Sequence, residues 1–278
     1  MTMSLQYSSA LISKLPNLSQ TRREDTWAPH FTDLIESDSI DKSRFRASQF
    51  QNPGEGQIYS RVISRVIDGR SRVGQIRLID LGCGSSLPTI ATLLKHQDLD
   101  IEVVAVDIDP AAVAVSEHNV MIAGLSSRFT FVNTDLIDYI NSFVFRAGDI
   151  IVANPPYIPV HFSVVDPDFL PINGGVDGLR FITPIINISR KCRIPIVFLA
   201  SSLSSPFTLL DNLQAFHKVD CIEGTFVPFG KYLKRSEIHA YLSMLRSHDQ
   251  IEFYETEAGN YEFLTLGFYA EPKQKLLK

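Results

Sequence analysis

The segment IRLIDLGCG at residues 76–84 decides the fold of this chain. It is a short apolar run that ends in Asp80 and continues into two glycines, Gly82 and Gly84. A stretch of helical character follows at residues 87–95. Glycines at the end of a strand permit positive φ and let a ligand approach the backbone, and a helix that starts there offers free N–H groups. We therefore predict a buried strand, a ligand-binding loop and a helix in succession.

Strands and helices continue to alternate along the chain after this loop. Asp109 precedes Pro110 at the start of an expected helix that Gly124 closes, and another helix is expected at residues 206–216. Such alternation, with continuous apolar strands, indicates an α/β fold with a parallel sheet covered on both faces. Ligands then bind at the carboxyl ends of the strands. Further strands are predicted at 101–106, 129–133, 149–153, 195–200 and near 218–227, and a terminal hairpin at 251–255 and 261–270.

The first 75 residues differ from the rest because they are polar and contain no β-rich run. We predict a separate helical and loop extension at residues 1–75 that serves as a lid over the substrate, and a core domain at 76–278. Residues 225–246 are expected to be an insertion near the end of that domain, with a helix around 236–246. Within the extension we expect short helices at 5–15 and 29–37, a turn or loop at 51–56, and a helix carrying Ile58, Val62, Ile63, Val66 and Ile67.

Composition narrows the classes of function. The formal net charge of −5 and the pI of about 5.8 disfavour duplex nucleic acid, which needs a basic face. The three cysteines have no CxxC spacing, so neither a disulfide framework nor a zinc site is indicated, and the histidines show no metal-ligand spacing either. Neither a signal peptide nor an apolar stretch of roughly 20 residues is evident. We expect a cytoplasmic protein without a membrane contact, and the oligomeric state is not indicated.

Judged by its residues alone, the loop at residues 80–84 could also bind a nucleotide. A dinucleotide fingerprint G-x-G-x-x-G would need its third glycine at Leu87, so that reading is disfavoured. Asp107 ends the next strand, 27 residues after Asp80, where a carboxylate can accept hydrogen bonds from a ribose diol. A capping role is the alternative for Asp107, but Asp109 already fills it. For Asp135, after the third strand, the alternative is also a helix cap or a turn.

A second motif, the tetrapeptide Asn154-Pro155-Pro156-Tyr157, follows the apolar run at residues 150–153. Two prolines cannot extend a strand and remove two N–H donors, which leaves the backbone carbonyl after Asn154 free. That carbonyl and the Asn154 side-chain oxygen can together accept hydrogen bonds from one –NH₂ group and fix its plane. Tyr157 can stack on a flat amide, base or ring. The alternative is a plain proline-rich turn.

Together the two motifs resemble those of class I S-adenosylmethionine-dependent methyltransferases. The resemblance implies a Rossmann-like fold with a mostly parallel seven-stranded sheet and a terminal antiparallel hairpin. It implies S-adenosyl-L-methionine as cofactor, with Asp80 near the methionine moiety and Asp135 receiving the adenine amino group. Many members of the superfamily have a third glycine where this chain has Ser86. The residues expected to bind the cofactor are Asp80, Gly82, Gly84, Asp107, Ile108, Asp135, Leu136 and Asn154.

The region downstream of the tetrapeptide resembles a narrower family. Asp166-Pro167 and the segment GGVDGL at residues 174–179 are similar to the pattern of protein-glutamine N5-methyltransferases that act on peptide release factors. In that family the tetrapeptide holds the amide of the glutamine side chain. The resemblance spans roughly residues 76–200. Without it, the glycine segment would be a flexible loop that opens the next helix, with Asp177 as a cap.

The expected activity is N-methylation of a planar amide or amine nitrogen, in a small molecule or a glutamine side chain. Direct SN2 transfer needs no strong base, because positioning and desolvation carry much of it. Asn154, Pro155 and Tyr157 are the expected catalytic residues, and Pro156 joins them in substrate binding. One alternative is methylation of an exocyclic amine in RNA or DNA. Another, of a different class, is a non-catalytic binding subunit with the same fold.

Overall fold

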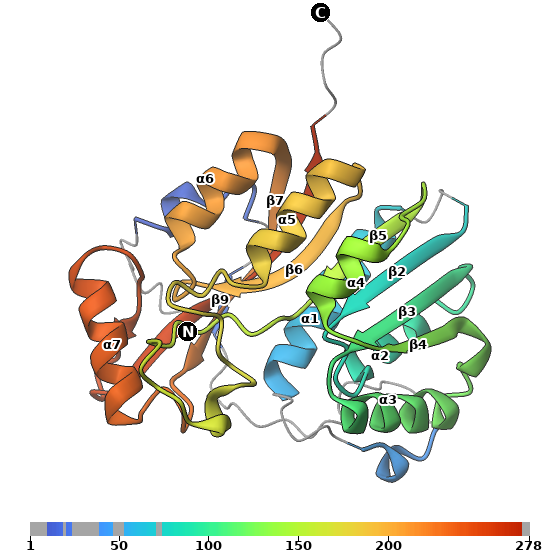
Figure 1. Cartoon of the computed structure of the whole chain (residues 1–278), viewed down its shortest axis with the longest axis horizontal. Helices are drawn as coiled ribbons and strands as arrows, with labels where there is room; N and C mark the ends of the chain where they lie inside the picture. Colours follow the sequence, from blue (N-terminus) through green and yellow to red (C-terminus); the bar gives the residue numbers. More distant parts are fainter. Residues whose placement is uncertain (1–9, 19–20, 24–38, 47–52, 71–73, 274–278) are drawn as a thin grey trace, which may run out of the picture.

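A single sheet organises the described part of the chain (Figure 1). The computed structural model describes residues 10–18, 21–23, 39–46, 53–70 and 74–273, and the structural statements below concern these residues. The strands are β1 (Thr21–Arg23), β2 (Ile76–Leu81), β3 (Ile101–Asp107), β4 (Phe129–Asn133), β5 (Asp149–Ala153), β6 (Ile196–Ser201), β7 (His217–Pro228), β8 (Tyr254–Glu255) and β9 (Tyr261–Pro272). Their order is β1-β7-β9-β6-β5-β2-β3-β4, with β8 paired to β9.

All neighbouring strands run parallel except at β9, which is antiparallel to β6, β7 and β8. In the centre, Leu81 at the end of β2 pairs with Val106 on β3 and with Ala153 on β5. These three strands therefore end at the same level. The loops that follow them meet at one edge of the sheet, where parallel α/β sheets bind ligands.

Helices cover both faces of the sheet (Figure 1). They are α1 (Pro53–Asp68), α2 (Leu87–Lys95), α3 (Pro110–Ile122), α4 (Leu136–Ser142), α5 (Ile182–Cys192), α6 (Pro206–Phe216) and α7 (Ser236–Ser247). Helix α2 packs between α1 and α3, whereas α4 packs against α5. The chain moves outward from β2 through β3 to β4, and in the opposite direction from β5 to β6. Right-handed crossovers in opposite directions place α2 and α3 on one face and α5 on the other.

The predicted α/β class, with a mostly parallel sheet and terminal antiparallel strands, is confirmed. The strands predicted at 129–133 and 149–153 match β4 and β5, and the helix predicted at 206–216 matches α6. The described sheet has nine strands and not seven, because β1 adds to β7 and the short β8 adds to β9. The predicted terminal hairpin is present, because β8 pairs antiparallel with β9, and β9 also lies within the sheet between β6 and β7.

One local prediction is wrong. Residues 51–56 were expected to form a turn or loop, but α1 begins at Pro53, so residues 53–56 are its first turn. Proline suits the first helical position, where its missing N–H is not needed, and burial of the helix outweighs the helix-breaking tendency of Gly54 and Gly56. The predicted helix at 29–37 lies outside the described residues. Of the one at 5–15, the described part contains only a 3₁₀ turn at Ile12–Lys14.

The described parts of residues 1–75 pack against the same sheet as the rest of the chain. Strand β1 pairs in parallel with β7, and α1 contacts α2, β6, β7 and β9. The approach of α1 to β9 is so close that a Cβ at Gly267 would lie about 3.3 Å or less from the methyl groups of Val62. Residues 225–228, placed in the predicted insertion, continue β7, and the helix expected around 236–246 is α7. The lid role of residues 1–75 stays a prediction.

No described helix is both long and apolar enough to cross a membrane.

Candidate active site

The glycine loop after β2 turns sharply beneath the carboxyl end of β3. Gly82 and Gly84 have φ of +74° and +56°, a region that favours glycine because it has no Cβ. The amides of Gly82 and Cys83 donate to the carbonyl of Val106 at 2.8 and 3.0 Å. Burial raises the pKa of the Cys83 thiol well above its usual value, which keeps it protonated and unreactive as a nucleophile. The loop is thereby fixed to the second strand.

Ser86 occupies the position where many related loops have a third glycine, and its φ is +54°. A non-glycine residue in this region costs roughly 1–2 kcal/mol. The Ser86 side chain does not cap α2; its hydroxyl instead bonds to the hydroxyl of Ser116 on α3 at 2.5 Å. This buried contact offsets part of the strain. The loop therefore keeps the glycine-type backbone even though the residue is serine.

Asp80 lies behind the loop and not on the cavity surface. It is 1% exposed, and its carboxylate accepts hydrogen bonds from the hydroxyls of Tyr59 on α1 and Thr89 on α2. Burial raises the pKa of Asp80 to about 6, although the two hydrogen bonds oppose the shift. Asp80 therefore ties two helices to the glycine loop, and its expected contact with a cofactor stays a prediction.

Asp107 and Ile108 form the next part of the site, at the end of β3. Asp107 accepts from the amide of Gly84 at 2.9 Å and from the amide of Asp109 at 3.0 Å. Burial raises the pKa of the Asp107 carboxyl, and these hydrogen bonds oppose that shift. The neighbouring Ile108 side chain is 66% exposed, which is unusual for a large apolar residue. Asp109 caps α3 through the amide of Ala111, as expected.

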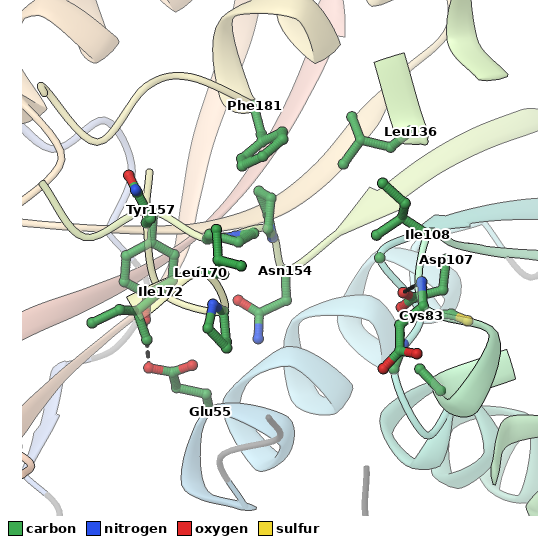
Figure 2. A pocket seen from close by; sticks show the side chains of 18 of the residues that line it. Glu55, Cys83, Asp107, Ile108, Leu136, Asn154, Tyr157, Leu170, Ile172 and Phe181 are labelled. Atoms are coloured by element: carbon green, nitrogen blue, oxygen red, sulfur yellow. Dashed lines mark hydrogen bonds between the residues drawn. The ribbon is translucent and has the colours of Figure 1, made fainter. Parts of the chain in front are cut away.

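Asp135 and Leu136 lie at the end of β4 on the same edge. One carboxylate oxygen of Asp135, Oδ1, accepts from the amides of Ile137 and Asp138 and so caps α4. The capping role considered for Asp135 is therefore real, and a role toward an adenine would have to come in addition. Leu136 and Ile108 face the cavity next to each other (Figure 2). Together they form an apolar slot beside the carboxylate of Asp107.

The tetrapeptide after β5 forms the opposite side of the site. The Asn154 side-chain oxygen Oδ1 is shielded from solvent and has no hydrogen-bond partner in the structure. Among the described residues, the carbonyl of Pro155 also meets no donor. An unsatisfied buried acceptor costs about 1–3 kcal/mol. Both acceptors are therefore open to a donor that the described residues do not supply.

Tyr157 is more enclosed than its expected stacking role requires. Its ring is 3% exposed, and its hydroxyl donates to Glu55 Oε1 at 2.7 Å. Its carbonyl accepts from the hydroxyl of Ser204 at 3.1 Å. The side chain lines the cavity, so a flat acceptor could contact it there. Stacking on the acceptor stays a prediction.

The glycine segment at residues 174–179 supports the tetrapeptide directly. A Cβ at Gly174 would lie 2.7 Å from the Cα of Tyr157, and one at Gly178 would lie 2.5 Å from the Tyr157 carbonyl oxygen. Asp177 caps the following turn through the amide of Leu179 at 2.9 Å, as expected. Close packing against the backbone of Tyr157 therefore gives Gly174 and Gly178 a structural role in addition to the turn that Asp177 caps.

Glu55, on the first turn of α1, is the residue of the site that the sequence analysis missed. Its carboxylate accepts a hydrogen bond from the Tyr157 hydroxyl at 2.7 Å, which opposes the rise in the pKa of Glu55 that burial causes. A signal was present in the sequence: Glu55, Tyr59, Val62 and Val66 share one helix face, and the last three are buried. A charged residue on a buried stripe indicates a specific partner.

These residues enclose one cavity of about 500 Å³ (Figure 2). This is the size range of sites for cofactors and small ligands. The cavity brings together every predicted site residue except Asp80, which is not among its described lining residues. Leu170, Ile172, Arg180 and Phe181 complete the wall on the tetrapeptide side.

Comparisons with known proteins agree on this fold and this region. The structure resembles the METTL16 MTase domain with a TM-score of 0.50 at 15% identity, covering 84% of this chain and 76% of that one. The fold is accordingly that of the Rossmann-like class I methyltransferases. A family described as ribosomal protein L11 methyltransferase (PrmA) matches residues 63–155.

Two curated relatives match part of the chain. The release factor glutamine methyltransferase of Moorella thermoacetica is 35% identical over 111 residues, which are 37% of this chain and 38% of that protein. The tRNA1(Val) (adenine(37)-N6)-methyltransferase of Bacteroides thetaiotaomicron is 34% identical over 94 residues, 34% of this chain and 38% of that protein. The chain thus spans about two fifths of the length of each. The resemblance to release factor glutamine methyltransferases, stated above from the motifs, is confirmed over the matched part of the chain.

Proposed function

We propose that this chain is an S-adenosylmethionine-dependent N-methyltransferase whose acceptor is a planar amide or amine nitrogen. The observation that carries the proposal is the unsatisfied buried oxygen of Asn154 beside the free carbonyl of Pro155. Two acceptors to which no described residue donates, in residues that line the cavity, match the two N–H bonds of one –NH₂ group. The names of the curated relatives support the same class of reaction.

The other half of the cavity fits the cofactor. Asp107 offers a carboxylate to a ribose diol, while Ile108 and Leu136 offer exposed apolar surface to a flat ring. Gly82 and Gly84 keep the loop backbone free of side chains where a ligand must pass closely. S-adenosylmethionine bound there would supply a methyl group carried on a positively charged sulfur. We assign its binding to Gly82, Gly84, Asp107, Ile108, Asp135, Leu136 and Asn154, with Asp80 supporting the loop from below.

The chain's own contribution to the reaction is orientation of the acceptor. Asn154 Oδ1 and the Pro155 carbonyl would each accept one N–H of the acceptor, which directs the nitrogen lone pair out of their plane. Tyr157 and Pro156 would close the sides of the acceptor pocket. An acceptor held in this way would present its nitrogen to the methyl group that the bound cofactor supplies, and the proton of the methylated nitrogen would leave to solvent. Holding the reactants in this geometry can supply a large part of the rate enhancement.

Two classes of acceptor have separate support. A glutamine side chain, or a small molecule with a similar amide, fits the similarity to release factor glutamine methyltransferases and the net charge of −5. An exocyclic amine of a nucleic acid is the second candidate, favoured by the similarity to tRNA adenine N6-methyltransferases. Both present the same –NH₂ group to Asn154. The acidic charge makes the first our preference.

The test combines a binding measurement with a transfer measurement. Calorimetric titration with S-adenosylmethionine and S-adenosylhomocysteine should give micromolar dissociation constants. Methyl-labelled cofactor is then incubated with the protein and a glutamine-bearing peptide, bulk tRNA, or a mixture of free amides and amines. We expect label in the peptide or the small-molecule fraction. Binding without transfer to any fraction would support the non-catalytic alternative, and absence of binding would overturn the proposal.

A further inference from the structure

Glu55 places a carboxylate in the wall of the cavity beside the tetrapeptide. It lies on the first turn of α1 and lines the cavity together with Asn154 and Tyr157. Figure 2 shows the side chain of Glu55 near these two residues, whereas Asp107 lies on the other side of the cavity. Helix α1 packs against α2 and β9, so the core of the protein fixes the place of this carboxylate.

The described part of the chain gives this carboxylate no cation. The Tyr157 hydroxyl donates to Glu55 Oε1 at 2.7 Å, and no ion pair of the described residues includes Glu55. Arg180, the basic residue among the described lining residues, instead lies over the ring of Phe181, 5.0 Å from its centre. Buried charges are normally paired, and burial raises the pKa of Glu55 because it disfavours the charged form. A cation that enters the cavity would reduce this penalty.

The other described carboxylates that line the cavity are already bound to backbone amides. Asp107 accepts from two amides, and Asp109 and Asp135 cap the starts of α3 and α4. Amides at the start of a helix carry partial positive charge and compensate a carboxylate in part. Glu55 receives no backbone amide among the described hydrogen bonds. It is therefore the carboxylate of the cavity that is open to a cation from outside the chain.

We propose that Glu55 is the counter-ion for the positively charged sulfur of S-adenosylmethionine, and that it makes the site prefer this cofactor to S-adenosylhomocysteine. The inference rests on the proposed function, because a methyl group reaches an acceptor held by Asn154 only if its sulfur lies beside Asn154. Glu55 lines this part of the cavity. S-adenosylhomocysteine has the same adenine, ribose and amino acid groups, but its sulfur is neutral. A charge on the cavity wall is therefore what can distinguish the two ligands.

This preference has a consequence for turnover. Positive charge passes from the sulfur to the acceptor nitrogen with the methyl group and leaves the site with the proton. A carboxylate in this part of the cavity stabilises the charge before and after the methyl group moves, so it strengthens binding without opposing the transfer. Once the proton has left, the cofactor product is neutral and Glu55 again has no cation. Glu55 therefore favours replacement of the spent cofactor by a new one.

Calorimetric titration of the full chain tests the proposal by measuring the dissociation constants of S-adenosylmethionine and S-adenosylhomocysteine side by side. Glu55→Gln keeps the size of the side chain and an acceptor for the Tyr157 hydroxyl but removes the charge. We expect it to weaken S-adenosylmethionine about tenfold and to change S-adenosylhomocysteine less than about twofold, as expected for the loss of one partly solvated charge interaction. Glu55→Asp keeps the charge and should lose less.

Two controls separate a local charge effect from other causes. Glu257→Gln removes the same charge at an exposed position in the turn before β9, and it should leave both dissociation constants unchanged. Sinefungin is a cofactor analogue that has a protonated amine in place of the methylated sulfur centre. Glu55→Gln should weaken sinefungin as it weakens S-adenosylmethionine, because both ligands carry the positive charge.

An unchanged preference for S-adenosylmethionine in folded Glu55→Gln overturns the proposal. Equal weakening of both ligands also overturns it, because that result indicates a purely structural role for the side chain. Should Glu55→Gln fail to fold, Glu55→Ala replaces it, with the same expected loss of preference and the same overturning results. Circular dichroism and the melting temperature verify that each variant is folded.

Failure of this inference and failure of the proposed function give different results. If neither ligand binds the parent protein, the proposed function fails and this inference fails with it. If both ligands bind but no acceptor in the panel is methylated, the proposed transfer fails, whereas the dissociation constants still decide the role of Glu55. If the parent protein transfers methyl groups and Glu55→Gln keeps the preference, the inference alone fails.

Discussion

The two halves of the cavity are built in different ways. On the cofactor side, Asp107, Ile108, Asp135 and Leu136 lie at the carboxyl ends of neighbouring parallel strands or within three residues beyond them. On the acceptor side, Glu55, the tetrapeptide and residues 170–181 come from three separate parts of the chain. The first half follows from the alternation of strands and loops. The second exists only once α1 and the glycine segment have packed against the tetrapeptide.

The two halves also differ in how closely their glycines pack against neighbouring atoms. The glycines of the cofactor loop have positive φ, and a Cβ at Gly82 would meet no atom within 4 Å, so that space is open. Gly174 and Gly178 instead press against the backbone of Tyr157. Open space at a glycine suits an exchangeable ligand, whereas close packing holds a reacting group in place. The variants below test this contrast, in order of expected effect.

Asn154→Ala removes the side-chain amide at the centre of the acceptor side and should have the largest effect. Loss of one preorganised hydrogen-bonding group in an enzyme site typically lowers kcat by about 10²–10³-fold, or roughly 3–4 kcal/mol. Methyl transfer should fall by that amount, while calorimetry shows that S-adenosylmethionine still binds. Asn17→Ala is a control, because its side chain bonds to Asp220 at an exposed position. Unchanged transfer in Asn154→Ala would place the acceptor elsewhere.

Gly178→Ala should disturb the acceptor side by displacing the backbone of Tyr157, against which Gly178 packs. The new Cβ would lie 2.5 Å from the carbonyl oxygen of Tyr157 and 2.8 Å from the Cα of Ser204, at a φ of +78°. Overpacking and positive φ together predict a loss of about 2–4 kcal/mol in the free energy of unfolding, measured by urea denaturation. Gly230→Ala is the matched control, because its Cβ would meet no atom within 4 Å. Equal stability of the two variants would contradict the close packing.

The same contrast explains how far the sequence could predict the site. Asp107 and Asn154 follow apolar runs, so the rule that parallel strands end at one edge was enough to bring them together. Glu55 was hidden because its partner Tyr157 is distant in sequence and because Gly54 and Gly56 suggested a loop. Asp80 was placed on the cavity surface by family resemblance, whereas its hydrogen bonds with Tyr59 and Thr89 depend on helix packing that no local pattern shows.

Asp80→Asn tests the hydrogen bonds that join α1 and α2 beneath the glycine loop. The pKa of Asp80 rises to about 6 in the folded protein from 3.8, so the folded state binds the proton more tightly than the unfolded state. Asp80 therefore stabilises the protein most below pH about 4, and this contribution is lost as the pH rises to about 6. The total change is at most about 2–3 kcal/mol. Asp80→Asn should remove this part of the pH dependence of unfolding.

Urea denaturation across that pH range measures the effect. Asp211→Asn, at an exposed position on α6, is the control and should keep the pH dependence of the parent protein. The Asn side chain can still bond to the hydroxyls of Tyr59 and Thr89, so the variant should fold. If Asp80→Asn and the parent protein show the same change in stability between pH 4 and 6, Asp80 is not held in the environment described.

Asp107→Ala should have the smallest effect and should be confined to the cofactor side. The carboxylate holds the amides of Gly84 and Asp109 and is our assigned partner for the ribose. We expect the dissociation constant for S-adenosylmethionine to rise about tenfold, or roughly 1.4 kcal/mol, in calorimetry. Asp107→Asn keeps one acceptor oxygen and should lose less. At saturating S-adenosylmethionine, kcat should fall much less than binding in either variant, because the described hydrogen bonds of Asp107 go to Gly84 and Asp109 and not to the acceptor side. A fall in kcat as large as that in Asn154→Ala would mean that the two halves of the cavity are coupled.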